Sequence, residues 1–211
     1  MHRTGQERPS SGRLTGMNTL AALVGFTIVG AGSPGPNNVL LWASGTEFGF
    51  RATLRHVAGS ALGVGSMALV AAAGVGAVIA AAPGVALVMK VAASAYLLYL
   101  AWQIAGAHAM ERGALSRPLG LGQATAFQLV NPKAWIVVLG AVGAFRPIEY
   151  PVVAGSVLVA VTMGLVVIPM ASLWAGAGGL IGRLIDDDRA RRVVSVTLAV
   201  LLVATVADVW A

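Results

Sequence analysis

Residues 33–38 read Ser-Pro-Gly-Pro-Asn-Asn and interrupt an apolar segment that is otherwise long enough to cross a bilayer. Residues 131–133 read Asn-Pro-Lys and break another apolar segment near its middle. A proline in a helix interior removes a backbone hydrogen bond and clashes with the preceding turn. In lipid, such a break persists only where protein or a water-filled cavity covers it. The two tracts therefore predict broken membrane helices, a pattern typical of transporter binding sites.

The composition is that of an integral membrane protein. Hydrophobic residues make up 57% of the 211 residues and charged residues 10%, whereas a soluble domain carries about 25% charge. The apolar runs are continuous rather than alternating, which favours helices over a barrel. The absence of cysteine excludes disulfides, thiol catalysis and thiolate metal sites. The net charge is +6, but the sequence has no basic patch with aromatic residues of the kind that binds nucleic acid. We therefore expect the lipid bilayer as a partner and no nucleic acid.

Six apolar segments of about 20 residues can be drawn along the chain. We expect them to be membrane-spanning helices at residues 17–44, 56–81, 85–104, 122–145, 152–173 and 193–210. A count of five is the alternative, because Lys133 lies near the centre of the fourth segment. The predicted fold is an all-α integral membrane protein with six transmembrane helices, of which the first and fourth are broken.

The predicted helices form one transmembrane transporter domain at residues 17–211. We expect two repeats of three helices, at residues 17–105 and 120–211. Because three is an odd number, the second copy must insert upside down, and the two breaks then face each other across a pseudo-two-fold axis. Residues 1–16 are polar and predict a disordered extension, although Met17 directly precedes the apolar run and is an alternative translation start.

The arginine residues of the loops predict the orientation. Those in the loops after the first, third and fifth spans are Arg51, Arg55, Arg112, Arg117, Arg183, Arg189, Arg191 and Arg192. The opposite side carries Arg146 and the three arginines of residues 1–16. Since cytoplasmic loops carry an excess of Lys and Arg, we expect both termini to lie outside the cytoplasm.

The first break suits an anionic group, and we expect Pro34, Gly35, Pro36, Asn37 and Asn38 to bind substrate. Proline is favoured in the first turn of a helix, so a half-helix begins near Pro36. Its unpaired N–H groups and partial positive charge favour a carboxylate. The two asparagines add amides that donate and accept hydrogen bonds. The alternative is a structural kink in which asparagine bonds a neighbouring helix.

The second break places a cation inside an apolar segment. Asn131 is a good N-cap and Pro132 suits the first helical position, so Lys133 lies in the first turn, where it opposes the helix dipole. A charge near mid-bilayer costs about 2.5–3.5 kcal/mol or more, which favours substrate binding by these three residues. The alternative is a shorter span with Lys133 reaching an interface. Lys90, in the third segment, either lines the same cavity or reaches outward.

Other polar residues have simpler interpretations. Glu47 and Arg51 are four residues apart in the first loop, where we expect a gating or anchoring role, and His56 is expected at the same interface. Gly59 and Gly63 form a Gly-x-x-x-Gly face for close helix packing. The first five spans contain no Asp or Glu, so lysines or backbone carbonyls must serve any coupling to ions. We expect no metal site and no cofactor.

Four motifs in order resemble the LysE/RhtB family of bacterial amino-acid exporters. Residues 33–40 are similar to its Pro-Gly-Pro signature, and residues 49–63 to its Gly-x-Arg and Gly-x-x-x-Gly stretch. Residues 90–100 resemble its lysine-to-tyrosine segment, and residues 131–135 its Asn-Pro-Lys motif. The similarity extends from Met17 to the C-terminus. The chain departs from the family pattern at some positions, such as alanine for a usual glycine, so membership does not define the substrate.

The resemblance implies a secondary exporter of a small amino acid or related zwitterionic metabolite in a bacterial inner membrane. Its driving force would be the proton gradient or the membrane potential. One alternative is an exporter of another small metabolite or ion of the same superfamily, although interior lysines repel cations. The other is an intramembrane enzyme, for which no nucleophile or metal constellation is present, so we expect no enzymatic activity. The sequence leaves the substrate, the coupling ion and a homo-oligomer open.

Overall fold

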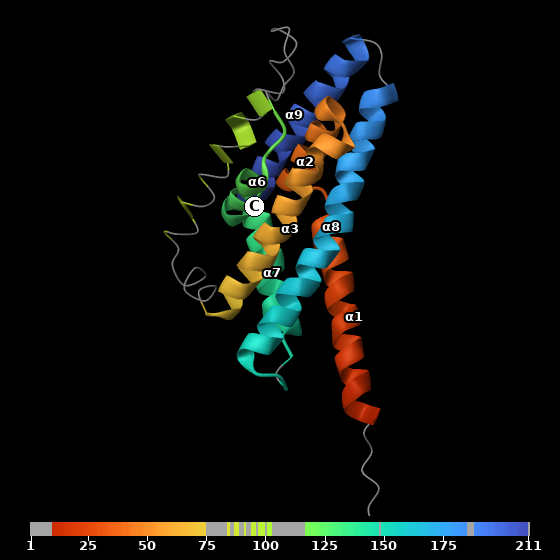
Figure 1. Cartoon of the computed structure of the whole chain (residues 1–211). Helices are drawn as coiled ribbons and strands as arrows, with labels where there is room; N and C mark the ends of the chain where they lie inside the picture. The colour runs from red at the N-terminus through yellow and green to blue at the C-terminus, as the bar shows by residue number, and fades with distance from the viewer. Residues whose placement is uncertain are drawn as a thin grey trace, which may run out of the picture.

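Every element in the described part of the chain is an α-helix (Figure 1). The computed structural model describes residues 10–74, 117–147, 149–184 and 188–210, together with residues 84, 87–88, 91, 94–95, 97–99 and 101–102. In chain order the helices are α1 (Ser10–Gly32), α2 (Pro36–Phe48), α3 (Phe50–Ala72), α6 (Leu121–Val130), α7 (Pro132–Phe145), α8 (Val152–Leu184) and α9 (Asp188–Trp210). The predicted all-α fold is confirmed.

Two apolar segments are broken where the sequence predicts. The axes of α1 and α2 meet at 62°, and those of α6 and α7 meet at 75°. In each pair a proline begins the second half-helix, Pro36 for α2 and Pro132 for α7. The first turn of a helix needs no N–H donor to a preceding turn, so proline is tolerated there while it prevents one continuous helix.

The described helices account for two to four membrane spans. α3 and α8 are each long and apolar enough to cross a bilayer, and each bent pair adds a span if its halves act together. α9 contains a shorter apolar stretch at residues 192–204. The third predicted span, residues 85–104, lies mostly outside the described residues. The count of six therefore stays a prediction.

The direction of the helices agrees with an inverted repeat. In Figure 1, α1 and α2 run along the bundle in one direction, and α6 and α7 run in the opposite one. The long helices that follow each broken pair, α3 and α8, are likewise antiparallel. A broken segment followed by a long helix thus occurs twice with opposite orientation, which is the arrangement that places two breaks at similar depth.

Small residues let the central helices approach closely. α8 packs against α3 and α2, and α3 also packs against α6. The predicted glycine face of α3 lies against α6, where a Cβ atom added to Gly63 would come within 2.7 Å of the Gln128 side chain. Between α2 and α8, Gly45 and Gly178 each lie so close to the backbone of the opposite helix that a methyl group would not fit. Close backbone contact of this kind is how helices associate in lipid.

Two helix ends differ from the sequence prediction. α8 continues to Leu184, well past the expected end at residue 173, because its glycines pack against the backbone of α2 at Trp42 and Thr46. α1 begins at Ser10 and so includes residues 10–16, which we expected to be disordered. No proline separates these residues from the apolar run, so the helix continues back to them.

Basic residues gather at one end of the bundle. The junction of α2 and α3, the end of α8 and the start of α9 lie together at the top of Figure 1. These segments carry Arg51, Arg183 and Arg189, whereas Arg146 follows α7 at the opposite end. This asymmetry is what the positive-inside rule uses. The assignment of that end to the cytoplasm stays a prediction.

Candidate functional site

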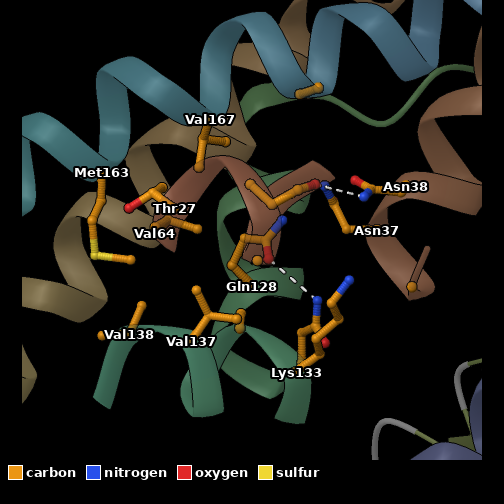
Figure 2. A pocket seen from close by; sticks show the side chains of 16 residues that line it. Thr27, Asn37, Asn38, Val64, Gln128, Lys133, Val137, Val138, Met163 and Val167 are labelled. Atoms are coloured by element: carbon orange, nitrogen blue, oxygen red, sulfur yellow. Dashed lines mark hydrogen bonds between the residues drawn. The ribbon is translucent and has the colours of Figure 1, made fainter. Parts of the chain in front are cut away.

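A cavity of about 50 Å³ lies between the two breaks (Figure 2). A cavity needs roughly 10–15 Å³ to hold one water, so this one has room for a polar group of a few atoms. Its walls come from α1, α3, α6, α7 and α8 as well as from both breaks. The polar side chains among its lining residues are Thr27, Asn37, Asn38, Gln128, Asn131 and Lys133.

Lys133 connects the two breaks directly. Its side chain extends from the first turn of α7, and Nζ donates hydrogen bonds to the carbonyl oxygens of Ser33 at 2.7 Å and Pro34 at 2.8 Å. These carbonyls follow the C-terminal end of α1, where the helix dipole is negative and favours a cation. The Lys133 ammonium therefore lies at the other break.

Gly35 leaves the room that this contact needs. A Cβ atom at Gly35 would lie 2.6 Å from Cδ and 2.8 Å from Nζ of Lys133. The backbone φ of Gly35 is 175°, an extended value that any residue adopts. The requirement for glycine is therefore one of space, and it ties the Pro-Gly-Pro tract of the first break to the lysine of the second.

Asn38 stabilises the shape of the first break. Its Nδ2 donates to the carbonyl oxygens of Ala31 at 2.7 Å and Ser33 at 2.8 Å, so both amide hydrogens serve the end of α1 (Figure 2). The backbone N–H groups of Asn38 and Val39 both bond to the Gly35 carbonyl at 3.0 Å. Asn38 thus completes the hydrogen bonding that the missing helical turn leaves open.

Asn37 is held by α3. Its Oδ1 accepts a hydrogen bond from Ser60 Oγ at 3.1 Å and lies 3.2 Å from His56 Nε2. His56 and Ser60 are both completely buried. The sequence did not predict this buried position of His56 beside the first break. α3 begins at Phe50, so His56 comes nearly two turns into the helix and faces the protein.

Asn131 leaves one acceptor unused. The side chain is 3% exposed, and its Nδ2 lies 3.4 Å from Gln128 Oε1 (Figure 2). Its Oδ1 has no hydrogen-bond partner among the described residues. A buried polar atom without a partner costs about 1–3 kcal/mol. An unpaired acceptor beside a cavity points to a ligand that supplies the missing donor.

The prolines of both breaks act through the backbone. Pro36 is buried and Pro132 is half-buried, and each begins the helix that leads away from its break. Pro34 is exposed, but its carbonyl accepts the bond from Lys133. Of the nine residues predicted to bind substrate, eight therefore lie in or beside the two breaks. Lys90 lies outside the described residues.

The predicted gating or anchoring pair lies away from the cavity. Glu47 and Arg51 are exposed at the junction of α2 and α3, and neither lines the cavity. Their place at the basic end of the bundle fits the role of an anchor better than that of a substrate ligand.

Two polar cavity residues were missed from the sequence. Gln128 is 2% exposed and lies one turn before Asn131. A polar side chain three residues from Asn131, on the same face of an apolar helix, was the available signal. Thr27 is fully buried, and its hydroxyl donates to the Leu23 carbonyl at 2.8 Å. A threonine that bonds within its own helix gives no such signal.

The site combines positive and negative ends. Lys133 is the one charged side chain that lines the cavity in the described part of the chain. The N-termini of α2 and α7 add partial positive charge, whereas the Asn131 acceptor and the carbonyls after α1 favour a cation. Within the same described residues no cluster of three or more His, Cys, Asp or Glu could hold a metal ion. The arrangement suits a small ligand with both an anionic and a cationic group.

Known proteins with similar sequences identify the family of this chain. A family model described as LysE type translocator matches residues 28–208. The chain is 31% identical over 185 residues to the cysteine/O-acetylserine efflux proteins of Escherichia coli (strain K12) and Shigella flexneri, and the match covers 87% of this chain and 93% of each relative. No solved structure shows a significant match. The resemblance inferred from the motifs is confirmed, and the chain belongs to the family of LysE type translocators.

Proposed function

We propose that this chain exports a small amino acid or a closely related zwitterionic metabolite and that the cavity between the breaks binds it. The observation that carries the proposal is the bond from Lys133 of the second break to the Ser33 and Pro34 carbonyls of the first. It places the cavity's one charged side chain, among the described residues, where two half-helices meet. Transport would be secondary, driven by the proton gradient or the membrane potential.

A zwitterion matches the groups around Lys133. The carboxylate of an amino acid can accept hydrogen bonds from the Lys133 ammonium, and its own ammonium can donate to the Ser33 and Pro34 carbonyls. Inserting the substrate between them replaces charge-assisted hydrogen bonds with similar ones, which are the strong hydrogen bonds of proteins. The unpaired Oδ1 of Asn131 offers a further acceptor for the substrate ammonium.

This exchange would link binding to movement. Lys133 belongs to α7 and the two carbonyls follow α1, so the direct bond holds the two breaks together. A substrate placed between them would separate the breaks and favour a different arrangement of the two repeats. A ligand shifts a conformational equilibrium only through such differential contacts. The proposed rocking of one half against the other would therefore pivot at Lys133.

The walls of the cavity favour a small, uncharged side chain. Val64, Val137 and Met163 contribute apolar surface opposite the polar groups (Figure 2). The relatives are named for cysteine and O-acetylserine, two small amino acids that share one headgroup. A cationic side chain would be repelled by Lys133. We therefore place cysteine-sized neutral amino acids first, ahead of the alternative of another small metabolite or ion.

We propose that the protein lies in the bacterial inner membrane with both termini outside the cytoplasm. Family membership and the apolar helices make this a multi-pass protein of a bacterial inner membrane. The arginine-rich end of the bundle supports a cytoplasmic position for the α2–α3 junction, which would leave both termini outside. A family of translocators also argues against an intramembrane enzyme.

Metabolite profiling of the medium tests the proposal. Cells that express the protein should release a small zwitterionic amino acid that cells without it retain. Cells that express Lys133→Ala at the same level are the control, because they should behave like cells without the protein. If the released compound were a cation or an uncharged metabolite, the proposed substrate class would be wrong.

A further inference from the structure

A stripe of polar side chains runs along the face of α3 that meets α2. Thr53, His56 and Ser60 are spaced three and four residues apart, and all three are fully buried. Thr53 Oγ1 forms a hydrogen bond with Ser44 Oγ of α2 at 2.9 Å. Buried polar residues in membrane helices are costly and are usually functional. His56 and Ser60 do not line the cavity, but both contact Asn37, which does.

The surroundings of His56 decide which ring nitrogen carries hydrogen. Nδ1 is buried without a partner among the described residues, whereas Nε2 lies 3.2 Å from Asn37 Oδ1. A buried N–H without an acceptor is rarer in proteins than an acceptor without a donor. A neutral imidazole therefore keeps its hydrogen on Nε2 and donates it to Asn37.

His56 then fixes the amide of Asn37. His56 Nε2 donates to Oδ1, and Ser60 Oγ lies 3.1 Å from the same Oδ1, although its single hydrogen is shared with the His56 carbonyl at 3.0 Å. With Oδ1 turned toward α3, the NH2 group of Asn37 must point away from α3, on the side of the cavity that Asn37 lines (Figure 2). Among the described residues no protein group accepts a hydrogen bond from that NH2 group.

We propose that His56 and Ser60 are positioning residues that make Asn37 a hydrogen-bond donor to the substrate carboxylate. This inference rests on the proposed function, and it adds the orientation of the substrate. Asn37 lies in the first turn of α2, where the helix dipole also favours an anion. The substrate ammonium would then lie toward the Asn131 acceptor and the carbonyls after α1.

The test compares two ligands that differ only in the carboxylate. Full-length protein, purified in detergent, is titrated with reduced cysteine and with cysteamine, its decarboxylated form. The wild type should bind cysteine more tightly. His56→Leu and Ser60→Ala should each weaken cysteine binding about 10-fold, the loss expected for a hydrogen bond to a charged group. Cysteamine binding should not change, because cysteamine has no carboxylate for Asn37.

Two further variants separate positioning from general damage. His56→Gln retains an N–H donor at about the same reach, so it should keep the preference for cysteine that His56→Leu loses. Ser66→Ala is the matched control for Ser60→Ala, because Ser66 is exposed on the same helix and its hydroxyl donates to the Leu62 carbonyl. It should bind both ligands as the wild type does.

The outcomes distinguish the inference from the function on which it rests. Equal losses for cysteine and cysteamine, or no loss for either, would overturn the positioning role while the wild type still bound cysteine. A larger loss for cysteamine would show that the carbonyl side of Asn37 faces the cavity, and it would also overturn the inference. If the wild type bound neither ligand, the proposed function would fail together with it.

Discussion

The first and second breaks each begin a half-helix at a proline but use their polar groups differently. At the first break, Asn38 serves the end of α1 with both amide hydrogens, and Asn37 is held by α3. At the second break, Asn131 keeps a buried acceptor without a partner in the described residues. Lys133 bonds to the carbonyls of the other break.

This difference shows that two proline breaks in one bundle need not have matching roles. At the first break, Asn38 holds the end of α1, and we propose that Asn37 and the carbonyls after α1 contact the substrate, whereas the second break contributes an unpaired acceptor and the charge. An amino acid is itself asymmetric, with an anion at one end and a cation at the other. A site with two equivalent halves would not distinguish those ends, and we propose that the unequal halves of this one do.

Removing the hydrogen bonds from Lys133 to the first break should have the largest effect on transport. Lys133→Ala deletes two charge-assisted hydrogen bonds, each worth about 1.5–3 kcal/mol, so transport in proteoliposomes should fall by on the order of 100-fold or more. Membrane insertion should be retained, because a costly intramembrane charge is lost. Arg183→Ala, at the exposed end of α8, is the control for charge removal. Full transport by Lys133→Ala would show that transport does not need the hydrogen bonds between Lys133 and the first break.

Because Asn38 holds the end of α1, replacing it should lower the stability of the protein. Asn38→Leu leaves the Ala31 carbonyl without a side-chain donor, whereas the Ser33 carbonyl keeps its bond from Lys133. An unpaired group costs about 1–3 kcal/mol, so the free energy of unfolding should fall by at least about 1 kcal/mol, seen as a lower Tm in detergent. Asn18→Leu, exposed on α1, is the matched control and should not lower the Tm. An unchanged Tm in Asn38→Leu would contradict the assigned role.

The opposite pattern is expected at the second break. Asn131→Leu removes an unpaired acceptor and one long hydrogen bond, from Nδ2 to Gln128 Oε1 at 3.4 Å, so the Tm should fall less than in Asn38→Leu. Substrate affinity should fall about 10-fold, because a hydrogen bond to the substrate ammonium is lost. If Asn131→Leu lowered the Tm as much as Asn38→Leu does, the proposed difference between the two breaks would be wrong.

The smallest effect is expected at Gly35. A Cβ in Gly35→Ala would overlap the Lys133 side chain at Cδ and Nζ and force it to move, but these atoms lie at the far end of a flexible chain. Transport should fall only a few-fold, on the order of 1 kcal/mol or less for a strained side chain. Gly25→Ala is the control, since nothing lies within 4 Å of its added Cβ. A larger loss than that of Lys133→Ala would point to a backbone role for Gly35.

Much of the architecture follows from local chemistry. The prolines at positions 34, 36 and 132 predict both breaks, because a missing N–H group and a fixed φ act within one turn of the chain. The glycine face at Gly59 and Gly63 likewise predicts close packing, and α3 packs there against α6. The unusual apolarity of the chain makes it a membrane protein whatever its tertiary contacts.

The division of tasks within the site was decided by tertiary structure alone. Lys133 bonds to carbonyls about a hundred residues earlier in the chain, and His56 is buried because α2 and its neighbours cover α3. Sequence patterns place Asn37, Asn38 and Asn131 at the breaks, but an amide acts as a cap, a donor or an open acceptor according to the partners that packing brings to it. Those partners come from distant helices, so no local pattern predicts them.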